Sequence, residues 1–173
     1  MKLFLDLVAA RYSCRAYADR EVPAPELDYI LEAARLAPSA CNRQPWRFVI
    51  IEKGDVAGRK AVIDSYNREW IASAPMFIVV CGVSSEGWVR RCDEHSHIDV
   101  DASIATEHIC LAAADRGLGT CWVCNFEPDV LRAGLGLDDS LVPVAIIPLG
   151  YPADDAKVPA KQRKDINEIV IRR

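Results

Sequence analysis

The spacing of apolar and polar residues along the chain predicts both helices and strands. Helical periodicity runs through residues 3–10, 25–36, 55–70, 99–116 and 128–135. Short apolar runs rich in β-branched residues predict strands over residues 46–52, 76–83, 120–124 and 142–150. Asp99 or Asp101 is expected to cap the long helix that ends near residue 116. Residues 76–83 are apolar nearly throughout, as in a strand buried on both faces, so we expect an α+β fold whose central sheet is covered by helices.

Length and composition favour a single domain over residues 1–173. Hydrophobic residues make up 51% of the chain and charged residues 27%, a balance that can bury one full core. Residues 84–98 show few regular signals and are interpreted as a variable, lid-like segment. Residues 152–173 form a polar tail that ends in Ile169-Val170-Ile171. This apolar tip must cover something, either its own sheet or a partner subunit.

Charge and cysteine content narrow the function classes. The net charge is −4 and the isoelectric point about 5.4, whereas a nucleic-acid binder is usually basic. Asp6 interrupts the N-terminal apolar run and Arg11 follows it, unlike a secretory leader, and no other apolar run is long enough to span a bilayer. Seven cysteines, mostly in apolar segments, favour reduced thiols over disulfides. We therefore expect a cytoplasmic protein with no nucleic-acid or membrane partner.

Arg11, Ser13 and Arg15 form the first candidate binding site. The two arginines lie four residues apart, so one turn of helix would let them converge on one anion. Guanidinium groups offer paired donors that suit phosphate, and the serine adds a hydroxyl. Late in the chain, Lys161 and Arg163 could reach the same phosphate. Read alone, each basic set is more typical of a solvated surface than of a binding site.

Residues 37–46, Ala-Pro-Ser-Ala-Cys-Asn-Arg-Gln-Pro-Trp, form a loop between a predicted helix and a buried strand. Asn42 and Gln44 each carry donors and acceptors, as the edge of a bound heterocycle would require, and Pro38 and Ser39 precede them. Loops held between rigid elements often carry function. The alternative is a plain turn in which Asn42 satisfies backbone groups.

Residues 117–126 join the end of a predicted helix to a short strand. Gly117 and Gly119 would let the backbone approach a flat ligand closely. Cys121 and Cys124 form a C-x-x-C, but a structural zinc site needs four ligands and a second such pair is absent from the sequence. We therefore predict no metal site and interpret these thiols as core or pocket lining.

Taken together, these segments resemble the nitroreductase family in its shorter, minimal form. An R-x-S-x-R element stands at residues 11–15 and an A-P-S-x-x-N-x-Q-P-W loop at residues 37–46. A run that opens with D-x-x-x-A and closes with G-L-G-T-x-W spans residues 101–122, and a K-x-R follows at residues 161–163. The elements occur in this order over nearly the whole chain, so their joint occurrence is far more specific than any one of them.

The resemblance implies a mixed central sheet covered by helices and an intertwined homodimer that binds FMN at its interface. The residues it assigns to the ribityl phosphate are Arg11, Ser13, Arg15, Lys161 and Arg163. The residues it assigns to the isoalloxazine, partly from the opposite subunit, are Pro38, Ser39 and Asn42. The backbone it places near flavin N5 belongs to Cys121, Trp122, Cys124 and Asn125. The implied reaction is ping-pong transfer of hydride from NADH or NADPH to a small oxidised acceptor, such as a nitroaromatic or a quinone.

Other activities fit the same resemblance, because a fold does not fix a reaction. A reductive dehalogenase, a flavin-modifying enzyme or a flavin-binding protein with little turnover would carry the same motifs. The sequence names neither the acceptor nor the preferred nicotinamide. Tyr12 stands where a second Arg is frequent in the family, and Trp88 either stacks on an aromatic substrate or fills the lid. Cys41 adds a third thiol near the predicted flavin, whose role stays open.

Overall fold

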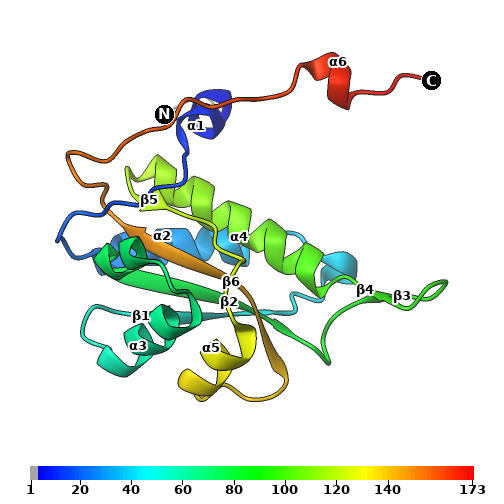
Figure 1. The fold of residues 1–173 in the computed structure, drawn as a ribbon. Helices are drawn as coiled ribbons and strands as arrows, with labels where there is room; N and C mark the ends of the chain where they lie inside the picture. The colour runs from blue at the N-terminus through cyan, green and yellow to red at the C-terminus, as the bar shows by residue number, and fades with distance from the viewer. Residues whose placement is uncertain (1–3) are drawn as a thin grey trace.

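A computed structural model describes residues 4–173, and a four-stranded sheet lies at its centre (Figure 1). The strands stand in the order β1-β2-β6-β5, and neighbouring strands pair antiparallel. Their bounds are β1 Trp46–Ile51, β2 Met76–Val83, β5 Gly119–Thr120 and β6 Leu141–Gly150. A parallel bridge between Ser13 and Thr120 adds a further segment beside β5, so the sheet is mixed, as expected.

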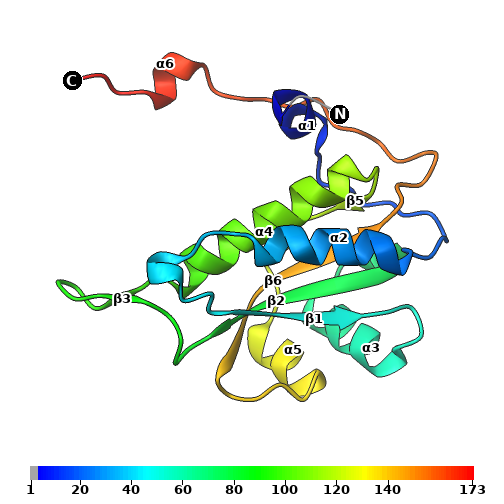
Figure 2. The same cartoon turned by 180° about the vertical axis from the view of Figure 1, so that it is seen from behind.

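Helices cover both faces of this sheet, which Figures 1 and 2 show from opposite sides. One layer contains α2 (Ala24–Arg35) and α4 (Ile98–Asp115), and the other contains α3 (Val56–Ser65) and α5 (Pro128–Gly134). Every residue of β2 is buried. Ile78 packs in the cluster with residues of α2 and α4, whereas Val79 packs in the cluster with residues of α3 and α5. The alternation of side chains along β2 therefore fills two cores, and the predicted α+β architecture is confirmed.

The predicted helix over residues 55–70 is shorter than the periodicity indicated. Asp55 caps α3 by accepting the N–H of Gly58 at 2.9 Å, and the helix ends at Ser65. Trp70 lies in a separate 3-10 helix, η2 (Glu69–Ser73), and its ring meets Tyr66 edge-on at 5.8 Å. Both aromatic rings pack against the core. The backbone of Tyr66, with φ −133° and ψ 89°, leaves helical geometry and ends α3.

The predicted strand over residues 120–124 is interrupted. The register that pairs Thr120 with Leu149 resumes where Val123 and Ile146 exchange both backbone hydrogen bonds, at 3.0 and 2.9 Å. In between, this register places Pro148 opposite Cys121. A proline has no N–H, so it cannot complete the ladder at that pair. The chain therefore runs along the sheet at residues 121–122 without being a regular part of it.

Neither Asp99 nor Asp101 caps α4, so this expectation was wrong. The helix begins at Ile98, and His97 occupies the N-cap position without a side-chain cap hydrogen bond. The carboxylate of Asp101 instead accepts the N–H of Ala40 at 2.8 Å. Ahead of the helix, the predicted lid-like segment contains a hairpin, β3 (Val89–Arg90) and β4 (His95–Ser96), that projects from the body of the domain (Figures 1 and 2).

The two terminal segments lie side by side in both views (Figures 1 and 2). Helix α1 (Phe4–Ala10) matches the predicted N-terminal helix within the described residues, and residue 3 lies outside them. The tail passes α1, where Lys161 Nζ contacts the carbonyl of Ala9, and continues into α6 (Ile166–Ile169). The apolar tip does not cover its own sheet, since Ile171 is 88% exposed.

Candidate functional site

Arg11, Ser13 and Arg15 do not lie on one helical turn, so the helical spacing expected for them was wrong: the N–H of Arg11 donates to the Leu7 carbonyl at 3.0 Å at the end of α1, whereas Ser13 lies outside the helix. Helix α1 ends at Ala10, after which the bridge from Ser13 to Thr120 holds the chain against the sheet. Arg11 lines one cavity beside this segment, and Ser13 and Arg15 line another. The guanidinium of Arg15 lies 5.8 Å from the centre of the Trp70 ring.

Several positively charged side chains of the N-terminal segment and the C-terminal tail lie near one another, as the pKa shifts of their neighbours indicate. Partial desolvation lowers the pKa of Lys161, and the charges of Arg11 and Arg163 lower it further. Burial raises the pKa of the Cys121 thiol, and Arg15 is the strongest of the groups that oppose this rise. We name Arg11, Arg15, Lys161 and Arg163 the cationic cluster, in which Arg11 interacts with Lys161 and also with the Cys121 thiol, and Arg15 interacts with that thiol. Side chains separated by about 150 residues in sequence thus meet at one surface, where an anion would relieve their repulsion.

Two cavities flank the segment that carries these residues. The larger, of about 420 Å³, is lined by Ser13, Arg15 and Lys157 among others. The smaller, of about 180 Å³, is lined by Arg11, Tyr12 and residues 117–120. Sequence reasoning missed Lys157, for which the only signal was its place in a basic tail.

Tyr12 gives the smaller cavity a neutral lining where the family frequently has a second arginine. Burial raises the pKa of Tyr12 to about 12, and the neighbouring Cys14 adds to the rise. The phenol therefore stays protonated at neutral pH and contributes no charge to the cationic cluster. Its hydroxyl lies 3.9 Å from the sulfur of Cys14.

The loop after Pro38 contains a short 3-10 helix, η1 (Ala40–Asn42), with an unusual backbone. Cys41, Asn42 and Gln44 have φ angles of 52°, 54° and 53°. Such left-handed conformations are uncommon for residues other than glycine. The Ser39 hydroxyl stabilises the loop by accepting the N–H of Gln44 at 2.9 Å. The exposed amide of Gln44 reaches back to the Asn42 carbonyl at 3.1 Å, so the polar groups expected here are gathered at one surface.

The η1 loop and the cationic cluster lie at opposite ends of α4. Asp101, near the N-terminal end of the helix, contacts Ala40 of the loop. Ala114, near the C-terminal end, lines the small cavity with Arg11. The rise of an α-helix puts these two ends about 20 Å apart. One protomer therefore brings the predicted phosphate residues together but does not bring the predicted isoalloxazine residues to them.

The C-x-x-C residues do not form a metal site. Cys121 is buried, whereas Cys124 is exposed and its sulfur accepts the indole N–H of Trp122 at 3.1 Å. Asn125 is exposed beside it. Across residues 4–173, no group of three or more His, Cys, Asp or Glu side chains is arranged to hold a metal ion.

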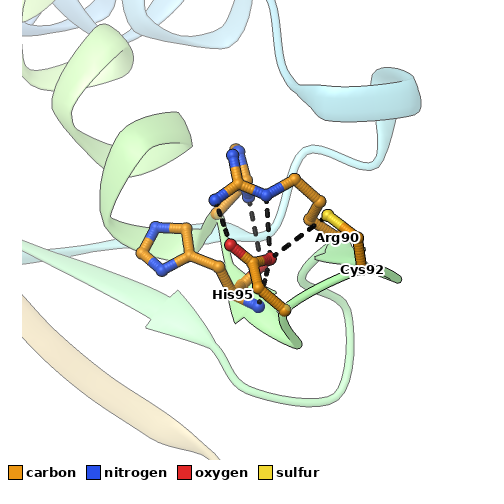
Figure 3. Close-up of polar contacts among 5 residues, drawn as sticks. Arg90, Cys92 and His95 are labelled. Atoms are coloured by element: carbon orange, nitrogen blue, oxygen red, sulfur yellow. Dashed lines mark hydrogen bonds and ion pairs between the residues drawn. The ribbon is translucent and has the colours of Figure 1, made fainter.

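The hairpin ahead of α4 is held by its own polar and aromatic contacts. Figure 3 shows Arg90, Cys92 and the backbone of His95 around one carboxylate, that of Asp93. The hydrogen bond from Arg90 is the main cause that lowers the pKa of Asp93 to about 2. At the base, the ring of Trp88 meets His97 edge-on at 4.7 Å. The indole is thus part of the internal packing of the lid-like segment.

Helix α4 also presents an apolar strip outside the domain. Val100 and Ile104 line an open hollow of about 490 Å³ together with Asp99, Ser103 and Glu107. Val100 is 46% exposed although its neighbours along the helix pack in the core. No helix within the described residues has the length and hydropathy needed to cross a bilayer.

Comparison with known proteins identifies relatives along almost the entire chain. The family described as Nitroreductase family matches residues 8–65 and 57–151. A Methanothermobacter thermautotrophicus protein named "Putative NADH dehydrogenase/NAD(P)H nitroreductase" is 34% identical over 160 residues, covering 87% of this chain and 78% of that protein. An iodotyrosine deiodinase from Danio rerio is 28% identical over 97% of this chain, which spans 66% of that relative.

Solved structures agree with the sequence relatives. A nitroreductase family protein from Clostridium difficile superposes with a TM-score of 0.90 at 38% identity, covering 98% of both chains. A Desulfovibrio desulfuricans protein solved in complex with FMN superposes with a TM-score of 0.86 at 26% identity, covering 100% of this chain and 98% of that one. With the fold, the motifs and these matches in agreement, the chain belongs to the nitroreductase family, a family of oxidoreductases.

Proposed function

We propose that the protein binds FMN and transfers hydride equivalents from NADH or NADPH to a small oxidised acceptor, a nitroaromatic or a quinone. The observation that carries the proposal is the cationic cluster beside Ser13, gathered from both terminal regions of the chain. The relative named as an NAD(P)H nitroreductase and the FMN complex of a similar structure support the choice of cofactors.

The residues of the cluster fit a phosphate monoester. Arg11 and Arg15 offer planar paired donors, Lys161 offers a compact charge, and the Ser13 hydroxyl adds a short donor. In this proposal these residues bind and orient the cofactor. The main chain at residues 121–122, where the ladder is interrupted, lies beside the cofactor with backbone groups that the sheet does not pair. FMN, when bound, supplies the hydride chemistry, so the chain needs no acid–base pair of its own.

A second copy of the chain completes the proposed site. The η1 loop lies about 20 Å from the cationic cluster of its own protomer, so it would serve the cofactor bound by a partner. Exposed Val100 and partly buried Ile104 on α4, and the exposed tip at Ile169–Ile171, offer apolar surface for such a contact. We therefore propose a homodimer in which both chains contribute to each cofactor site.

Reductive dehalogenation is the second candidate activity, because the relatives include an iodotyrosine deiodinase. The Trp88 indole packs against His97 within the lid, an arrangement that does not select between the two acceptor classes. Turnover of matched nitroaromatics, quinones and halophenols by the same reduced protein would separate them.

The deciding experiment is the visible absorption spectrum of the purified protein, recorded before and after anaerobic addition of NADH or NADPH. Flavin bands that bleach on addition would support the proposed reductase. Flavin bands that persist would favour a binding protein with little turnover. Absence of flavin bands after incubation with FMN and desalting would overturn the proposal.

A further inference from the structure

Asp101 is a buried carboxylate with a single partner. The residue is 2% exposed and belongs to the first turn of α4. Its Oδ1 accepts the N–H of Ala40 at 2.8 Å, whereas no donor within residues 4–173 reaches Oδ2. Charge-assisted hydrogen bonds are stronger than neutral ones, and this charge is not shared among several side-chain or backbone donors. The carboxylate therefore acts mainly on Ala40.

Ala40 is the residue at which the chain enters its left-handed stretch. Ser39 is still extended, with φ −141° and ψ 161°, and Cys41 and Asn42 then have positive φ angles. Non-glycine residues keep such angles only where the surroundings hold them. Fixing the N–H of Ala40 fixes the direction of the backbone just before Asn42, and with it the place from which the Asn42 side chain projects.

The other contacts of the loop are less rigid anchors. The bond from the Gln44 N–H to the Ser39 hydroxyl is internal to the loop. The Arg43 guanidinium reaches the carbonyl of Gly87 at 2.8 Å, at the base of the projecting hairpin. Asp101, in contrast, stands on an 18-residue helix packed against the sheet. The hydrogen bond to Asp101 therefore fixes the position of the loop relative to the core of the domain.

We propose that Asp101 is a positioning residue for the cofactor site: it holds Ala40 so that Asn42 is presented to the isoalloxazine bound by the partner subunit. This inference rests on the proposed function. It explains why the aspartate that the sequence pattern assigned to a helix cap is turned inward, away from the uncapped end of α4. Asp101 does not contact the reacting atoms and acts through the loop.

The test uses the variants D101A, D101N and A40P. D101A removes the acceptor, and D101N retains a neutral acceptor of the same shape. A40P removes the donor and directs the proline Cδ toward Oδ1 of Asp101, so the carboxylate must move away, while the extended backbone of Ser39 suits a following proline. The matched control is T106V, because Thr106 is buried on the same helix and bonds only to the Ala102 carbonyl, at 2.7 Å. Three quantities are measured: amide hydrogen exchange over residues 41–44 without cofactor, the dissociation constant for FMN, and the visible spectrum of bound flavin.

D101A and A40P are expected to speed exchange over residues 41–44 at least tenfold, to raise the FMN dissociation constant about tenfold and to shift the flavin bands. D101N should stay within about threefold of wild type, and T106V should lower the melting temperature without moving the other readouts. If D101A and A40P behave like T106V, the inference is overturned. If neither of these two variants folds, D101N decides: exchange over residues 41–44 more than threefold faster than in wild type, with unchanged FMN affinity, overturns the inference. If wild type binds no FMN although D101A loosens the loop, the proposed function fails while the anchoring by Asp101 stands.

Discussion

The two ends of α4 are built by opposite means. At the C-terminal end, the cationic cluster consists of long, charged side chains from the N-terminal segment and the tail. At the N-terminal end, the η1 loop depends on backbone angles at Cys41, Asn42 and Gln44 and on the buried anchor Asp101. In the proposed function, one end attracts the cofactor through charge, and the other orients it through shape. The two ends should therefore respond differently to salt and to substitution.

The largest effect is expected from R15A at the charged end. Loss of a charge-assisted hydrogen bond to phosphate removes about 1.5–3 kcal/mol, so the FMN dissociation constant should rise by roughly 10- to 150-fold. Added salt should weaken binding to wild type more than to R15A, because screening acts on the missing charge. R132A, which removes an arginine paired with Asp129 and Asp139 on the opposite layer, is the control. Equal FMN affinity of R15A and R132A would show that the cluster does not bind the cofactor.

Removal of residues 165–173 tests whether the tail belongs to a subunit interface. Ile166, Ile169 and Ile171 are exposed in the single chain. Burial of each against a partner would contribute about 1.5–3 kcal/mol, so the truncated chain should dissociate at concentrations at least tenfold higher than wild type. Sedimentation velocity over a dilution series measures this. The control is K164S, a substitution next to the truncation site. An unchanged sedimentation profile of the truncated chain would exclude the tail from the interface.

At the loop end, the pair N42G and N42A separates the side chain from the backbone. Glycine keeps the left-handed φ of 54° at low strain and removes only the amide, whereas alanine also disfavours the backbone. We expect FMN binding to weaken about threefold in N42G and about tenfold in N42A, with the same salt dependence as wild type. Isothermal titration at two salt concentrations checks this. If both variants weaken binding equally, the strained backbone contributes nothing.

The smallest effect is expected at the hairpin. Asp93 has a pKa of about 2, below its ordinary 3.8, because of its bond to Arg90. A lowered pKa means that the ion pair is fully formed above about pH 4 and is lost as the pH falls toward 2. The amide resonance of His95 should therefore show a transition below about pH 4 that is absent from D93N. In D93N it should be displaced at every pH, while FMN affinity changes less than about twofold, since the pair is exposed. A midpoint for His95 near pH 4 would contradict this.

The sequence predicted the charged end better than the loop end, for a physical reason. Charged residues are visible in a sequence, and Arg11 and Lys161 lie near each other even though the helical turn invoked for the two arginines is absent. Family motifs also located the η1 loop. Its left-handed angles and its tie to Asp101 depend on contacts between segments about 60 residues apart, which no local pattern records.

Helices and strands could be told apart from the sequence, because buried residues recur with a different spacing in each. The residues at which these elements end could not be predicted in this way. The strand β2 and helix α4 follow directly from their apolar patterns. The break near Cys121 depends on a proline in a different strand. Ends of this kind are set by tertiary neighbours.

Pro148 has a consequence that reaches beyond the regularity of the sheet. Its register opposite Cys121 withholds one N–H from the edge of the sheet, and its own carbonyl accepts the hydroxyl of Tyr17 at 3.2 Å instead. Any other residue at this position would offer the missing donor and could draw residues 121–122 into a continuous strand. Because Pro148 cannot donate this hydrogen bond, the main chain at residues 121–122 stays outside the regular ladder. Its backbone groups are then left for a flat ligand to contact.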